Sequence, residues 1–356
     1  MAASKSYFGC ARSLLQHVTA IVVAITSSKV QSKTNGRKQQ ILGGITMANL
    51  DFLNKEKLTT GFGNVITDAK TYDDVLVQAG LNWTVNARPM YTEVDGTQIV
   101  VPNMNVIVRN EDMKPLGVVS NKYKTVNNTD AFAFTESIFN SKDIEFIRGG
   151  SFKDGRSTWL EAKITGEFSI LGDTTDCYLV FKNSHDGTGA VNCFIVPTRI
   201  ACSNALNFAS KKAPRTWRCS HMGSPLEKIK EAQSVLLAGS TYMNAINKEA
   251  ELLNNIKLSS RQINQFIERL FPINDEMTER AKEKCMLRRI QLMSVYTEKD
   301  DLANFDDTGY KFVSAVVDYV NHVNGKNTKT AALNRFMSVA SGNPLVDKAY
   351  DMVMTA

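Results

Sequence analysis

Between residues 82 and 197 apolar and polar positions alternate with a period of two, and turn residues separate the apolar runs. This pattern predicts a series of β-strands. The Asp-Gly pairs at 95–96 and 154–155 are typical of tight hairpins, so the strands that flank them are expected to be antiparallel. The runs predicted as strands are 104–109, 116–120, 144–152, 157–164, 177–183 and 190–197.

Two helices are expected in the same half of the chain. Thr71, followed by two acids and then by Gly80, predicts a short helix over 71–80. A second helix is expected over 129–139. An antiparallel sheet with packed helices belongs to the α+β class.

From Ser224 onward the apolar spacing becomes helical. Ser224, Pro225 and Glu227 offer a cap, a first-turn proline and a capping-box acid for a long segment that ends near Ile256. Further helices are expected over 260–270, 275–296, 308–323, 328–340 and 345–353. The sequence therefore predicts a core domain over 47–223 and a mainly helical domain over 224–356.

The first 46 residues have a different composition from the rest. They hold six Lys and Arg but no Asp or Glu, and their apolar run from Leu14 to Ile25 is shorter than the roughly 20 residues that span a bilayer. The codons of Gly43 and Gly44 can form a purine tract of the kind that binds the ribosome, and this tract would lie two codons before Met47. We therefore expect residues 1–46 to be a non-native leader or a disordered extension, with the native start at Met47.

The formal net charge of +6 comes entirely from this leader. The other 310 residues hold 36 Lys and Arg against 36 Asp and Glu. Only a local cluster of cations can therefore indicate a polyanionic partner.

One such cluster lies between Asp186 and Glu227, where forty residues contain no acid. Single-stranded nucleic acid binds to cations that contact phosphates and to aromatic rings that stack on bases. The residues expected to make these contacts are Arg199, Lys211, Lys212, Arg215, Trp217 and Arg218. The alternative is a basic loop that acids of the helical domain neutralise, with Trp217 in the core.

Four other residues are weak candidates for a metal site, namely His185, Asp186, Cys219 and His221. Structural zinc usually requires four ligands at paired spacings, and this sequence lacks those spacings. A hairpin turn at Asp186-Gly187 and a buried Cys219 thiol are the favoured interpretations. We expect no cofactor, and the five scattered cysteines of residues 47–356 indicate reduced thiols and a cytoplasmic location.

Several motifs in order resemble the phage/plasmid-like protein family, whose central region is domain of unknown function 932. They are Leu81-Asn-Trp-Thr-Val, Ala87-Arg-Pro, Pro115-Leu-Gly-Val-Val-Ser-Asn-Lys-Tyr, Gly149-Gly-Ser-Phe, Gly155-Arg-Ser-Thr-Trp, Gly172-Asp, Asn183-Ser-His-Asp-Gly and Thr198-Arg-Ile-Ala-Cys-Ser-Asn-Ala-Leu-Asn, and more loosely Thr308-Gly with Ala315, Asp318, Tyr319 and His322. The resemblance implies a protein of a phage, prophage or plasmid and implies no defined activity.

These observations lead us to expect a non-enzymatic DNA-binding protein in the host cytoplasm. Single-strand binding or annealing during replication or recombination is the expected role, and no membrane partner is expected. Two alternatives stay open: a metal-dependent hydrolase that uses the His185 region, and a protein that binds a host factor or forms homo-oligomers.

Overall fold

The computed structural model describes residues 63–136, 140, 143–199, 204–205, 216–231, 239–303, 305–323, 338 and 342–356. All of them belong to one compact unit, residues 55–356. The leader, most of the predicted helix over 328–340, and Lys211, Lys212 and Arg215 lie outside the described residues. The division at residues 223 and 224 and the start at Met47 stay predictions.

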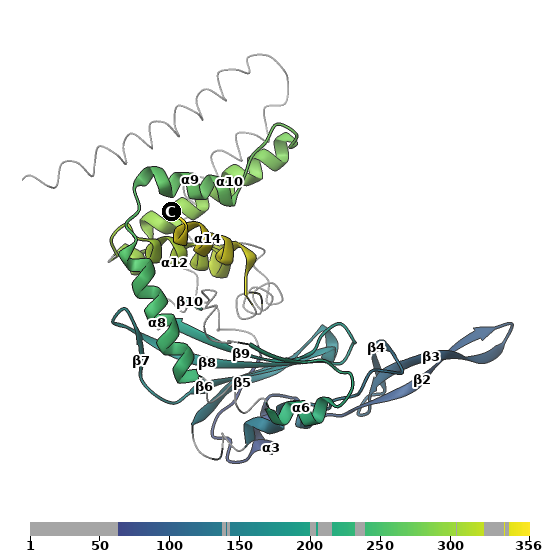
Figure 1. Ribbon diagram of the computed structural model, residues 1–356. Helices are drawn as coiled ribbons and strands as arrows, with labels where there is room; N and C mark the ends of the chain where they lie inside the picture. The colour runs from purple at the N-terminus through teal and green to yellow at the C-terminus, as the bar shows by residue number, and fades with distance from the viewer. Residues whose placement is uncertain are drawn as a thin grey trace, which may run out of the picture. The chain divides into compact units, whose positions relative to one another are not determined.

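The larger sheet is antiparallel throughout (Figure 1). Its strand order is β1-β5-β6-β8-β9-β10, while β7 pairs with β8 and β11 pairs with β9. The strands are β1 (Asn64–Val65), β5 (Ile144–Phe152), β6 (Ser157–Ile164), β7 (Phe168–Ile170), β8 (Asp173–Ser184), β9 (Val191–Arg199), β10 (Asn204–Ala205) and β11 (Thr216–Cys219). The predictions for 144–152 and 157–164 are confirmed at both ends.

The smaller sheet has the order β2-β3-β4. It is made of β2 (Val85–Val94), β3 (Thr97–Arg109) and β4 (Lys114–Ser120). The predicted Asp-Gly turn is confirmed, because Asp95 and Gly96 connect β2 and β3 with φ angles of 50° and 76°, the left-handed backbone of a two-residue hairpin loop.

Short helices accompany the larger sheet. Thr71 caps α3 (Tyr72–Gln78), as predicted, and the structure adds a capping box with Asp74. α4 (Asn128–Phe132) continues into the 3-10 turn η1 (Ala133–Thr135), and α6 (Pro225–Glu231) follows β11. Phe132 on α4 packs against Phe181 of β8, with ring centroids 6.5 Å apart, so α4 contributes directly to the sheet's core.

The two sheets meet where β4 lies against the β8–β9 turn. A Cβ on Gly117 would lie 2.5 Å from the Cα of Asp186, so only glycine allows this approach. The Tyr123 hydroxyl, just after β4, donates a hydrogen bond of 2.9 Å to the Ser184 carbonyl. These contacts hold the turn that contains His185 and Asp186.

The C-terminal part is helical, and the α+β class is thereby confirmed. The helices are α8 (Gly239–Asn255), α9 (Ser260–Leu270), α10 (Glu279–Glu298), α11 (Asp300–Ala303), α12 (Gly309–Asp318), the π-helical turn η3 (Tyr319–Val323) and α14 (Pro344–Met354). α12 forms the centre, since nine of its residues are buried. In the described part of the chain, every helix is too short or too polar to cross a membrane.

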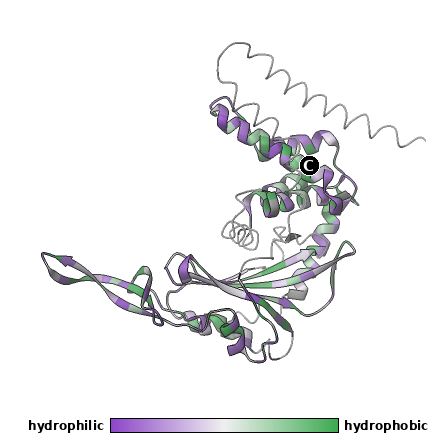
Figure 2. Ribbon diagram, turned by 180° about the vertical axis from the view of Figure 1, so that it is seen from behind, coloured by the Kyte–Doolittle hydropathy of each residue, from purple (hydrophilic) through white to green (hydrophobic). Residues whose placement is uncertain are grey.

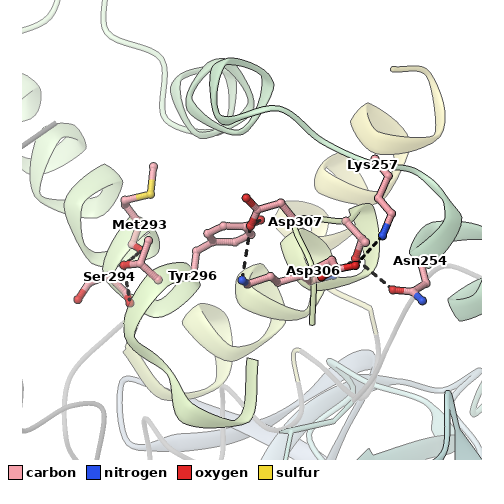
Figure 3. Close-up of polar contacts among 10 residues, drawn as sticks. Asn254, Lys257, Met293, Ser294, Tyr296, Asp306 and Asp307 are labelled. Carbon is pink, nitrogen blue, oxygen red and sulfur yellow. Dashed lines mark hydrogen bonds and ion pairs between the residues drawn. The ribbon is translucent and has the colours of Figure 1, made fainter. Parts of the chain in front are cut away.

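Polar contacts connect the loop before α12 to its neighbours (Figure 3). Lys257 and Asp306 form an ion pair of 2.9 Å. The Tyr296 hydroxyl donates to Asp307 at 2.8 Å, and Lys311 lies 3.5 Å from the same carboxylate. These contacts fix the start of α12 against α10 and the end of α8.

Candidate nucleic-acid interface

The acid-free segment contains β9 and β11 of the larger sheet, which pair with each other. Arg199 is the last residue of β9, and β11, which carries Trp217 and Arg218, pairs antiparallel with β9. Strand pairing therefore places Arg218 directly opposite Asn192.

Trp217 and Arg218 lie on opposite faces of the sheet, because neighbouring residues of a strand alternate. Trp217 is half-buried opposite the buried Cys193, whereas Arg218 is exposed opposite the half-buried Asn192. A nucleic-acid strand that lies on one face therefore contacts only one of the two.

A row of residues runs across four strands on the face of Arg218. Trp159 of β6 pairs with Lys182 of β8, Lys182 pairs with Asn192 of β9, and Asn192 pairs with Arg218 of β11. Lys182 and Arg218 are two strands apart, about 10 Å at the usual strand spacing. The row contains two cations and no acid.

A second lysine lies close to Lys182. The Lys182 ammonium is 5.8 Å from the centre of the Phe152 ring, and Lys153 follows Phe152 at the end of β5. Burial and then repulsion from Lys153 lower the pKa of Lys182, while the nearby Asp186 acts in the opposite direction. An anion at this position would relieve the repulsion between the two ammonium groups.

We call Lys153, Lys182 and Arg218 the cationic cluster. Within the described residues none of the three forms an ion pair, whereas Arg109 pairs with Asp112, and Lys163 with Asp176 at 2.8 Å. Lys153 and Lys182 lie outside the acid-free segment, so the charge pattern of the sequence does not single them out. Only strand pairing shows that Lys182 is a neighbour of Arg218.

His185 is a buried residue that helps to hold the fold together. It is 1% exposed, and its Nε2 lies 2.9 Å from the Oδ1 of Asn128. Burial, followed by repulsion from His221, lowers its pKa to about 3, so the ring is neutral near pH 7. An enclosed imidazole with so low a pKa is a poor general base near pH 7.

The Asp186 carboxylate accepts hydrogen bonds from residues of its own turn. Its Oδ1 accepts hydrogen bonds from the Ser184 hydroxyl at 2.7 Å and from the Thr188 hydroxyl and amide at 2.6 and 2.9 Å. These bonds help to lower the pKa of the carboxyl. The predicted turn at Asp186-Gly187 is present between β8 and β9.

His221 and Cys219 also make local contacts. The His221 ring stacks on Tyr123 with centroids 4.7 Å apart, and its Nδ1 lies 3.2 Å from the Lys124 carbonyl. The buried Cys219 thiol lies 3.7 Å from the Pro225 carbonyl. Among the residues that the structure describes, no three His, Cys, Asp or Glu side chains come together as a metal site.

The architecture is that of an antiparallel α+β protein. The motifs named above resemble one family, and a comparison with known families identifies the same one. Residues 115–340 match the family described as Domain of unknown function (DUF932), and the chain belongs to that family. No curated protein and no solved structure matches the chain.

Proposed function

We propose that this protein binds single-stranded DNA through the face of the larger sheet that carries the cationic cluster. The observation that carries the proposal is the row in which Lys182 and Arg218 share one face, without an acid between them and without an ion pair among the described residues. Phosphate contacts supply most of the affinity of such interfaces.

The cluster also includes a ring suited to stacking on a base. Phe152 is half-buried beside Lys182, so part of its ring is accessible. Stacking of one base on an aromatic side chain contributes roughly 1–3 kcal/mol. In this proposal Lys153, Lys182 and Arg218 contact successive phosphates, while Phe152 contacts a base.

The residues expected from the sequence keep their place in the proposal. Arg199, Lys211, Lys212 and Arg215 are proposed to contact phosphates, and Trp217 is proposed to contact a base of a strand that passes around the sheet edge. The protein acts without enzymatic chemistry in the host cytoplasm, as part of the replication or recombination of a phage, prophage or plasmid. Annealing of complementary strands is the specific activity that we infer.

The test is retention of a labelled oligonucleotide by the full chain at low salt. The double variant Lys182→Gln/Arg218→Gln should bind at least tenfold more weakly, and the salt slope should fall in magnitude by about 0.7 for each phosphate that the variant no longer neutralises. Arg261→Gln is the matched control, because Arg261 is an exposed cation on α9, away from the cluster.

Two outcomes would refute the proposal. One is an absence of retention by the full chain even at low salt. The other is a double variant that binds like the control, because the cluster would then make no contact with the oligonucleotide.

A further inference from the structure

The hairpin of β2 and β3 extends beyond the three-stranded sheet (Figure 1). β4 pairs with β3 only from Met104 to Arg109, so residues 90–101 form a two-stranded arm. A register shift follows Pro89, where β3 contains extra residues. Asn103 lies in this bulge with a φ of 59°, and Asn121 holds it through a side-chain hydrogen bond of 2.9 Å. The bulge sets the direction in which the arm leaves the sheet.

Each face of the arm carries two exposed apolar side chains. Tyr91 pairs with Val100 on one face, while Ile99 and Val94 lie on the other. These four side chains are between 47% and 55% exposed. Figure 2 shows apolar and polar stretches alternating along the hairpin. A two-stranded hairpin is marginal in water by itself, and grouped exposed apolar side chains mark an interaction surface.

The arm carries negative charge. Glu93 and Asp95 are the only charged residues between positions 90 and 103. Both are exposed, and neither forms an ion pair with a described residue. This charge disfavours nucleic acid as the partner and is complementary to an apolar surface flanked by cations.

The first half of α10 provides such a surface. No residue from 279 to 291 is buried, and Met286, Leu287 and Ile290 are 38% to 43% exposed. Their helical positions place them on the side opposite the buried Leu292 and Val295. This half of the helix therefore presents an apolar face that the described residues leave exposed.

Cations flank that apolar face. Arg280 and Lys284 are exposed and form no ion pair within the described part of the chain, whereas Lys282 pairs with Glu279, and Arg289 with Glu268. Glu279 and Glu283 lie on the same side of the helix as the apolar residues, and Glu279 pairs with Lys282. Over 279–291 five cations stand against these two acids, so the surface complements the arm in hydrophobicity and in net charge.

We propose that the arm of one copy docks on the first half of α10 of a second copy, with Glu93 and Asp95 near Arg280 and Lys284. The contact is made by the faces of the arm, where the exposed apolar side chains lie. The interface joins two different surfaces and is heterologous. It is independent of the DNA-binding proposal.

The test is the mass of the full chain in solution after nuclease treatment, measured by light scattering at increasing concentration. The wild type should exceed the 39.5 kDa of one chain. Glu93→Lys/Asp95→Asn should shift the mass to that of the monomer, and so should Arg280→Glu/Lys284→Glu. Combining the two sets restores opposite charges and should recover assembly. Glu167→Lys, an exposed acid between β6 and β7, is the control and should leave the mass unchanged.

A cross-link locates the contact independently. With Val94→Cys in the arm and Leu287→Cys on α10, in a chain that also carries Cys285→Ser, a bismaleimide should join position 94 of one chain to position 287 of another. Val118→Cys on β4 is the matched control, since Val118 is 48% exposed but lies outside the arm. A wild type that stays monomeric or that dissociates with nuclease would overturn the proposal, as would an assembly that both sets of charge variants leave intact.

Discussion

The Nε2 atom of His185 lies 2.9 Å from the Oδ1 atom of Asn128, and this contact fixes the proton on the imidazole. Asn128 donates its Nδ2 hydrogen to the Leu81 carbonyl, so its Oδ1 accepts, and His185 must donate from Nε2. The Nδ1 of His185 is left as a buried lone pair without a partner among the described residues. His185, which the sequence offers as a candidate metal ligand, is thus part of the packing of α4 against the larger sheet.

The stability of the protein should depend on this neutral histidine. Its folded-state pKa of about 3 is below the usual value near 6.5, so the unfolded chain takes up the proton first as the pH falls. The stabilisation is complete above about pH 6.5 and decreases at about 1.4 kcal/mol per pH unit toward pH 3. Urea unfolding at intervals between pH 7 and pH 4 measures the slope.

His185→Gln separates this effect from general acid sensitivity. The variant should be less stable at pH 7, but its stability should change less with pH than that of the wild type. Equal slopes for the two proteins would show that His185 is not the titrating group.

Asn128 should be among the most sensitive polar positions. Its Oδ1 also accepts a hydrogen bond of 2.9 Å from the Thr158 hydroxyl, so Asn128→Ala leaves several buried polar groups unpaired. Each such group costs about 1–3 kcal/mol, and we expect a total loss of about 3 kcal/mol in the free energy of unfolding. Asn86→Ala, which removes an exposed hydrogen bond to Asn110, should cost less than about 0.5 kcal/mol in the same denaturation experiment.

Gly117→Ala should disturb the contact between the two sheets. The added methyl group would overlap the backbone of Asp186, which has no flexible end to move away, and overpacking of this kind costs about 1–3 kcal/mol. The melting temperature should therefore fall. Gly150→Ala is the control, because its nearest neighbour would be at 3.5 Å, an ordinary contact, and a comparable loss there would remove the steric explanation.

Removal of one partner of the Arg148–Glu161 ion pair should lower the free energy of unfolding strongly, whereas replacement of both partners by apolar residues should change it little. Both side chains are at most 4% exposed, and burial outweighs the attraction of Arg148 and raises the pKa of Glu161. Arg148→Met should destabilise by about 3–5 kcal/mol because it leaves a buried acid, whereas Arg148→Met/Glu161→Leu should be near neutral. Denaturation of the four proteins of this cycle gives the coupling, and additive effects would contradict it.

The sequence was sufficient for elements with strong local signals. Thr71 caps α3 where predicted, and the helix predicted over 260–270 is α9, because a side-chain cap and helical spacing coincide there. The helix predicted over 129–139 is partly confirmed: α4 ends at Phe132 and a 3-10 turn follows. The helix predicted from 275 begins later, at Glu279, because Thr278 supplies the cap.

The candidate site could be recognised only from the tertiary structure. Lys182 precedes Arg218 by 36 positions in the sequence, and only the pairing of β8, β9 and β11 makes them neighbours. Likewise, the alternation of β11 separates Trp217 from Arg218, although they are adjacent in the sequence. The charge pattern singled out Arg218 but not Lys182, and it could not show which face either of them occupies.

The bulge at Asn103 has a consequence for any assembly built from the arm. When copies join through two different surfaces, the copy at one end of the row has a free arm and the copy at the other end has a free α10 surface. The row closes into a ring only when the rotation between neighbouring copies divides a full turn evenly. Because the bulge directs the arm, it also sets that rotation. The geometry of a few backbone residues would thus decide between closed rings of fixed size and open filaments.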